Sequence, residues 1–220
     1  ESVTGLIRRH GGEFRPGDAW LVNSPYCGGT HLPDITVITP WFDAAGETVL
    51  FYLASRGHHA DVGGLTPGSM PPGSVNIAEE GVISAGLKIV ADGRLREAAL
   101  REWLGSGPYP ARNPEQNLAD LRAQIAANQR GAQGLLQLVE RYSLATVQAY
   151  MGHVQAHAEA CVRRAIAGLQ DGAFAVTLDT GATIRVAVRV DLARRRAVID
   201  FSGTAPQQGD NLNAPAAVCK

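Results

Sequence analysis

The stretch GGTHLPDI, residues 28–35, contains a histidine and an aspartate three positions apart. Pro33 between them fixes one backbone angle, and the two leading glycines let the chain turn closely, so both side chains can reach one point in space. Combined with a second histidine from elsewhere, His31 and Asp34 form a ligand set that suits Mn²⁺, Fe²⁺ or Zn²⁺. This stretch therefore predicts part of a divalent-metal site.

A second source of histidine is SRGHHADVGG, residues 55–64. Strand-like runs at 35–42 and 48–55 are separated by DAAGE, whose Asp and Gly are typical of a hairpin turn. Antiparallel pairing of these runs places the start of the first beside the end of the second. We therefore expect Asp34 to lie close to the tandem histidines, in one site.

The adjacent His58 and His59 would face opposite ways in an extended strand. At most one is therefore expected to be a direct metal ligand, and the sequence does not decide which. The other can orient a ligand, contact the substrate or move protons. Asp61 can share a face with His59, and Glu80 ends a long loop rich in Gly and Pro, where its carboxylate can act as a base, a further ligand or a solvated turn residue. The predicted catalytic residues are His58, His59, Asp61 and Glu80.

Simpler structural explanations exist for several of these features. A histidine near an aspartate is often only a hydrogen-bonded pair, in which case the cluster is not a metal site. Arg56 can clamp an anion, or it can pair with Asp61 or Asp34. His153 and His157, four residues apart on a predicted helix, lack the intervening Glu of a metalloprotease helix and are expected on a solvated face.

The chain changes character along its length, and the order of its elements predicts an α+β fold. Residues 1–112 combine short strand-like runs with long loops and would contain the metal site. Residues 113–170 carry leucines at helical spacing and predict a long helical pair, with Ser143 as the cap of the second helix and Gly172 past its end. Residues 171–220 return to β-branched runs that predict antiparallel strands continuing into a missing C-terminal part.

Composition narrows the class of protein. The 220 residues carry a formal net charge of −1, which argues against a nucleic-acid partner or an acidic membrane surface. No run approaches the roughly 20 apolar residues that cross a bilayer. The cysteines Cys27, Cys161 and Cys219 are widely spaced and odd in number, which favours a reducing, cytoplasmic compartment. Cys27 can in principle act as a nucleophile, but nothing in the sequence singles it out.

Both ends of the chain resemble the interior of a protein. The first residues read as the end of a helix without an initiator methionine, and the last residues stop on an apolar run. We therefore expect a piece of a larger protein. No phosphate-binding or dinucleotide-binding motif is present.

Several long motifs occur together in a recognisable order: RPGDAWLVNSPYCGGTHLPDITVITPWF, ASRGHHADVGGLTPGSMPPGS, EEGV, DLRAQIAANQRG, and DFSGTAPQ followed by NLNAP. In this order they resemble the hydantoinase B family, over nearly all of residues 14–217. That family includes the B subunit of ATP-dependent N-methylhydantoinase, the matching half of 5-oxoprolinase, and subunits of acetone and acetophenone carboxylases.

The resemblance implies a hetero-oligomer in which a hydantoinase A-type subunit or domain binds ATP, which accounts for the missing nucleotide motif. In the lactam-opening members ATP activates the ring amide oxygen and water then opens the ring, whereas the carboxylase members join an activated ketone to activated bicarbonate. The B-type subunit holds a divalent metal (Mn, Zn or Fe). Carried over, its ligands are His31, Asp34 and either His58 or His59.

One position departs from the family pattern. The family commonly has an acidic residue directly before the proline that lies upstream of the THLPD sequence. This chain has Ser24 before Pro25 instead, and the loss of a carboxylate can alter the surroundings of the metal or the substrate. The expected function is ATP-dependent hydrolysis of a cyclic amide, a hydantoin or a lactam. The alternatives are a subunit of a ketone carboxylase, a non-catalytic module that docks the ATP-binding partner through the helices at 114–169, and a stand-alone metallohydrolase.

Overall fold

A computed structural model describes residues 1–220 and resolves into two compact units. Unit 1 comprises Glu1–Leu135 with Gly209–Lys220, and unit 2 comprises Leu136–Gln208. The boundary falls inside α3 (Pro114–Tyr142), so one helix belongs to both units. The α+β class and the antiparallel strands are confirmed. The segments 1–112, 113–170 and 171–220 differ in secondary structure, and as domains they stay a prediction.

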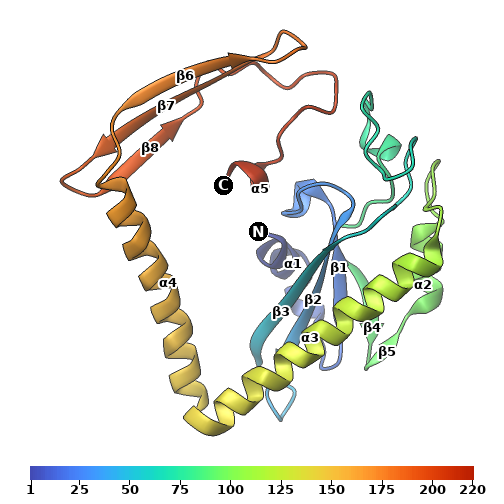
Figure 1. Ribbon diagram of the computed structural model, residues 1–220. Helices are drawn as coiled ribbons and strands as arrows, with labels where there is room; N and C mark the ends of the chain where they lie inside the picture. Colours follow the sequence, from blue (N-terminus) through green and yellow to red (C-terminus); the bar gives the residue numbers. More distant parts are fainter. The chain divides into compact units, whose positions relative to one another are not determined.

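The centre of unit 1 is an antiparallel sheet with strand order β3-β2-β1-β4-β5 (Figure 1). Its strands are β1 (Ala19–Val22), β2 (Asp34–Phe42), β3 (Val49–His58), β4 (Leu87–Ala91) and β5 (Arg94–Leu95). The hairpin predicted between β2 and β3 is confirmed. The Asp43 carboxylate closes its turn by accepting hydrogen bonds from the backbone N–H groups of Glu47 and Thr48.

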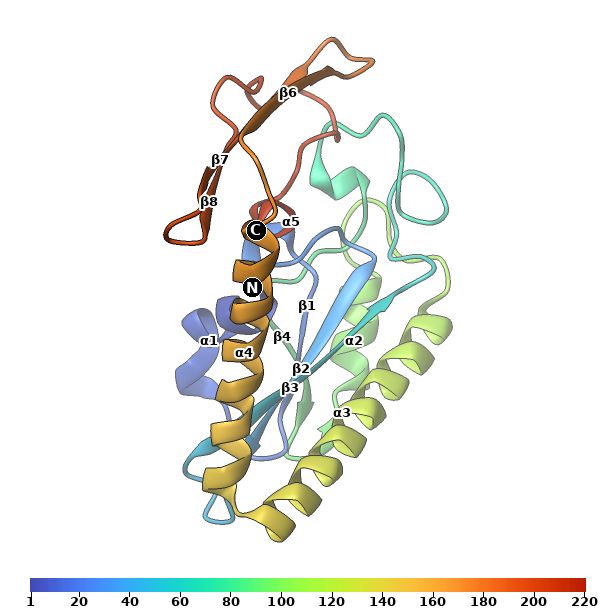
Figure 2. The ribbon, with the colours of Figure 1, turned by 60° about the vertical axis from the view of Figure 1, so that its left-hand side comes forward.

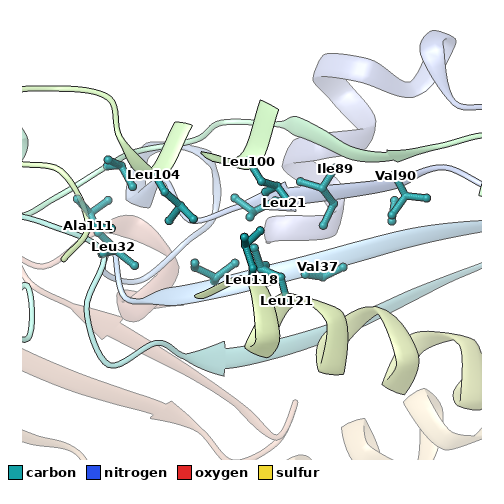
Figure 3. Close-up of a cluster of buried hydrophobic side chains, with 14 residues drawn as sticks. Leu21, Leu32, Val37, Ile89, Val90, Leu100, Leu104, Ala111, Leu118 and Leu121 are labelled. Carbon is teal, nitrogen blue, oxygen red and sulfur yellow. The ribbon is translucent and has the colours of Figure 1, made fainter. Parts of the chain in front are cut away.

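Helices cover both faces of this sheet. They are α1 (Ser2–His10), α2 (Glu97–Leu104) and α3. Unit 1 also contains the 3₁₀ turns η1 (Gly11–Glu13), η2 (Pro25–Cys27) and η3 (Ile77–Glu79), and the short α5 (Ala216–Cys219), which contacts η2. Strand residues alternate between the faces, as the period of a β-strand requires. Thus Leu21 and Val37 join leucines of α2 and α3 in the main core, drawn in Figure 3, whereas Trp20 and Ile38 pack with Leu6 of α1.

Unit 2 contains the end of α3, α4 (Leu144–Ile166) and a three-stranded antiparallel sheet, whose order is β6-β7-β8 (Figure 2). Its strands are β6 (Gly172–Thr177), β7 (Thr183–Asp191) and β8 (Arg196–Asp200). Ser143 caps α4 as predicted, accepting a hydrogen bond from the N–H of Thr146. The helix ends before Gly172, which already begins β6. No helix in the structure combines the length and the apolar character needed to cross a membrane.

Candidate metal centre

The hairpin of β2 and β3 brings the two histidine-bearing stretches together. Asp34, the first residue of β2, lies opposite His58, the last residue of β3. Two residue pairs further along, Thr36 lies opposite Arg56. The expected proximity of Asp34 to the tandem histidines is therefore confirmed, and it follows from the antiparallel register.

Three side chains converge at this end of the hairpin. Nδ1 of His58 lies 3.1 Å from Oδ1 of Asp34, and Nδ1 of His31 lies 3.3 Å from Oδ2 of the same carboxylate. The two imidazole rings are 5.1 Å apart between centroids. One ligand atom from each of the three residues lies within 4.8 Å of the others. Each oxygen of Asp34 thus faces a different imidazole.

The loop at residues 30–34 (THLPD) holds this arrangement through hydrogen bonds of its backbone and of the Thr30 side chain. The N–H of Asp34 donates to the carbonyl of His31 at 3.1 Å, and the hydroxyl of Thr30 donates to Oδ2 of Asp34 at 2.7 Å. The carbonyl of Pro33 accepts the N–H of His59 at 2.8 Å. This last bond ties the first stretch to the second.

The carboxylate of Asp34 is held in its ionised form. Partial burial raises the pKa of Asp34, but hydrogen bonds from Thr30 and His58 and the nearby imidazoles outweigh that effect and leave the pKa below its ordinary value. An ionised carboxylate is the form that binds a cation.

The donor set fits a divalent transition metal. Two imidazole nitrogens and one carboxylate oxygen suit Zn²⁺, Mn²⁺ or Fe²⁺, and a set of three protein ligands leaves room for water or substrate. The side chains keep solvent access, with 35% of His31, 21% of Asp34 and 52% of His58 exposed. A small ligand can therefore reach all three from solvent.

His59 lies on the opposite face and has no free ring nitrogen. It is 1% exposed; its Nε2 lies 3.1 Å from Oε1 of Gln124, and its Nδ1 lies 3.0 Å from Nδ2 of Asn117. Because Nε2 of Gln124 donates to the carbonyl of Ile35, its Oε1 must accept, which assigns the proton of His59 to Nε2. Burial lowers the pKa of His59, so the ring is neutral. The geometry therefore favours His58 over His59 as the third ligand.

Polar side chains of α3 form hydrogen bonds to both strands of the hairpin. Gln124 also donates to the carbonyl of Ser55, and Asn128 donates to the carbonyl of Val37 and the hydroxyl of Thr39. The sequence reasoning did not single out Asn117, Gln124 or Asn128. Their spacing of seven and four residues, in register with the buried leucines, is the signal that places them on the buried face.

The other predicted residues lie outside the three-residue cluster. Asp61 accepts hydrogen bonds from the side chain of Arg112 and from three backbone N–H groups, so it fastens the start of the loop that follows β3. Although partial burial raises the pKa of Asp61, these donors outweigh it and keep the pKa below its ordinary value. Glu80 accepts from the hydroxyl of Ser74 at 2.9 Å. Catalytic roles for His59, Asp61 and Glu80 stay predictions.

Ser24 and Cys27 lie in the turn that leads to the cluster. Ser24 is 2% exposed, and its carbonyl accepts the N–H groups of Cys27 and Gly29. The thiol of Cys27 lies 3.1 Å from a guanidinium nitrogen of Arg9. His153 and His157 are exposed on α4, as expected for a solvated helix face.

This chain is similar in fold to two solved structures. It aligns with an ATP-dependent caprolactamase from Pseudomonas jessenii at a TM-score of 0.79 and 26% identity, covering 98% of this chain and 37% of that one. It also aligns with an acetone carboxylase at a TM-score of 0.83, covering 97% of this chain and 30% of that one; at 18% identity this shows the fold alone.

The sequence comparisons identify the family. A family model described as Hydantoinase B/oxoprolinase matches residues 1–220, and the chain is 41% identical over 217 residues to a 5-oxoprolinase of Dictyostelium discoideum. The chain belongs to the Hydantoinase B/oxoprolinase family, and the resemblance drawn from its motifs is confirmed. The alignment covers 94% of this chain but only 17% of that relative, so the chain corresponds to a small part of the longer enzyme.

Proposed function

We propose that this chain carries the divalent-metal site of an ATP-dependent enzyme that hydrolyses a cyclic amide, a hydantoin or a lactam. The observation that carries the proposal is the convergence of His31, Asp34 and His58 from two stretches of one hairpin. The similarity to a 5-oxoprolinase and to an ATP-dependent caprolactamase supports this class of reaction over ketone carboxylation. A hydantoinase A-type subunit or domain would supply the ATP site.

The residues of the chain would divide the work in a simple way. His31, Asp34 and His58 would hold Mn²⁺, Zn²⁺ or Fe²⁺, which lowers the pKa of bound water and polarises a carbonyl oxygen. Thr30 orients the carboxylate of Asp34, and the loop backbone keeps His31 beside it. A ring amide is a poor electrophile, so coupling to ATP in the partner explains why the chain needs no strong nucleophile of its own.

Metal analysis of the purified full-length complex tests this assignment. We expect stoichiometric metal in the wild type, lost on chelation together with ATP-coupled ring opening. His31→Ala and His58→Ala should each remove the metal, because each deletes one of three ligands. The matched control is His153→Ala, which deletes an exposed imidazole on α4 and should leave metal content unchanged.

The alternatives give different results in the same experiment. A wild-type complex that contains no metal and stays active after chelation would reduce the cluster to a structural turn and favour a docking module. Metal-dependent amidase activity without ATP or a partner would favour a stand-alone metallohydrolase. Bicarbonate-dependent consumption of a ketone would favour a carboxylase.

A further inference from the structure

Arg56 lies beside the metal centre, on the same face of the hairpin. It is paired across the strands with Thr36, two residue pairs away from Asp34 and His58. Alternate residues of a strand share a face, so all four side chains project from one side of the sheet. Two residues along a strand span about 7 Å. A small molecule can therefore touch the cluster and Arg56 at once.

Neutral hydroxyl groups fix the guanidinium of Arg56. Its Nε donates to Oγ1 of Thr36 at 2.9 Å, and its Nη2 donates to Oγ of Ser2 at 2.9 Å. The Ser2 hydroxyl donates its own hydrogen bond to the carbonyl of Gly28 at 2.7 Å, so it can only accept from Arg56. These contacts orient the side chain without compensating its charge.

The carboxylates that could neutralise Arg56 are used elsewhere. Asp34 faces His31 and His58, and Asp61 is paired with Arg112 at 2.8 Å. Arg56 takes part in none of the ion pairs of the chain. Neither of the simple pairings that the sequence suggested is therefore made, and the alternative left is the binding of an external anion.

We propose that Arg56 binds an oxyanion of the substrate, while the reacting carbonyl lies at His31, Asp34 and His58. The oxyanion is either a carboxylate on the ring or the phosphoryl group of the ATP-activated form. With Nε and one N–H of Nη2 engaged, the other edge of the guanidinium stays free, and its fork matches a carboxylate or a phosphate in a bidentate manner. An uncompensated cation beside a dication also favours an anionic ligand. This inference rests on the proposed function.

The test uses the full-length protein assembled with its ATP-binding subunit. Arg56→Gln removes the charge, Arg56→Lys keeps the charge but removes the fork, and Arg130→Gln is the matched control on the exposed side of α3. KM and kcat are measured for a five-membered lactam that carries a carboxylate next to the nitrogen, and for its carboxamide. Calorimetry measures binding of the carboxylated lactam and of inorganic phosphate, and metal content is determined in every sample.

The two sources of the oxyanion give different signatures. If Arg56 binds the ring carboxylate, Arg56→Gln raises KM for the carboxylated lactam by about 10- to 100-fold and leaves the carboxamide unchanged, with a smaller rise for Arg56→Lys. If it binds the phosphoryl group, kcat falls for both lactams and the affinity for phosphate weakens by a similar factor. In both cases the metal content of the Arg56 variants stays at the wild-type value, and so do the KM, kcat and binding affinities of Arg130→Gln.

Two results would overturn the inference. One is binding and turnover by Arg56→Gln within about twofold of wild type for every ligand. The other is loss of metal from Arg56→Gln, which would make Arg56 a support of the metal centre instead of a contact of the substrate. A wild-type complex that opens neither lactam would exclude both compounds as substrates, and the calorimetry would still decide whether Arg56 binds the anion.

Discussion

Replacing Gln124 by methionine should loosen the strand that carries His58. The side-chain amide of Gln124 bonds the buried ring of His59 and the carbonyls of Ile35 and Ser55, so it links α3 to both strands of the hairpin. Methionine is similar in length and unbranched, and it can fill the space without replacing any of the three hydrogen bonds.

The expected cost follows from these contacts. The Nε2–H of His59 would be left without an acceptor in a site that is 1% exposed, which costs about 1–3 kcal/mol. The two lost bonds to carbonyls cost about 0.5–1.5 kcal/mol each, and the extra apolar burial of methionine returns about 1 kcal/mol. The free energy of local opening should therefore fall by about 1–5 kcal/mol, which makes hydrogen exchange roughly 5- to 4,000-fold faster.

Hydrogen exchange of peptides that cover residues 49–60 in the full-length protein measures this change directly. Gln129→Met is the matched control, because Gln129 is exposed on the same helix. If exchange in β3 is unchanged in Gln124→Met, or equally faster in the control, then the amide does not anchor the hairpin.

Two further predictions concern the loop after β3. Folding lowers the pKa of Asp61 from its ordinary value of 3.8. The ionised carboxylate therefore contributes stability at pH values above 3.8, and this contribution is lost as the pH falls through the lower pKa of the folded protein. Asp61→Asn should flatten the acid limb of the pH profile of stability, measured by urea unfolding. Gly63 has φ +96, and a Cβ there would lie against the carbonyl of Tyr109, so Gly63→Ala should destabilise the full-length protein by about 2–4 kcal/mol. Gly68→Ala, also at positive φ but facing open space, should cost only about 1 kcal/mol in the same thermal unfolding assay, and equal effects would contradict the steric explanation.

The hairpin and its site were largely predictable from local chemistry. The turn residues between the two strand-like runs fix antiparallel pairing, and that pairing alone brings Asp34 to His58. The choice between His58 and His59 was not predictable, because it depends on which face of β3 meets α3. Strand alternation correctly predicted that the two rings point apart, but it could not name the buried one.

The hydrogen-bond partners of Asp61 could not be predicted from the sequence. Asp61 is held mainly by backbone N–H groups and by Arg112, which lies 51 positions away. Polar residues on a helix, such as Gln124, are usually expected to face water, and only the register of the buried leucines places this one inside.

The contact between Gln124 and β3 has a consequence for the fidelity of folding. A slip of one residue reverses the faces of a strand, and with tandem histidines either register would still place an imidazole beside Asp34 at the candidate metal site. The side-chain amide of Gln124 packs over Gly57, where even a Cβ would lie 3.4 Å away. A shifted strand would press the side chain of Arg56 or His58 into that space. The helix therefore recognises the correct alignment by the one residue of the strand that has no side chain.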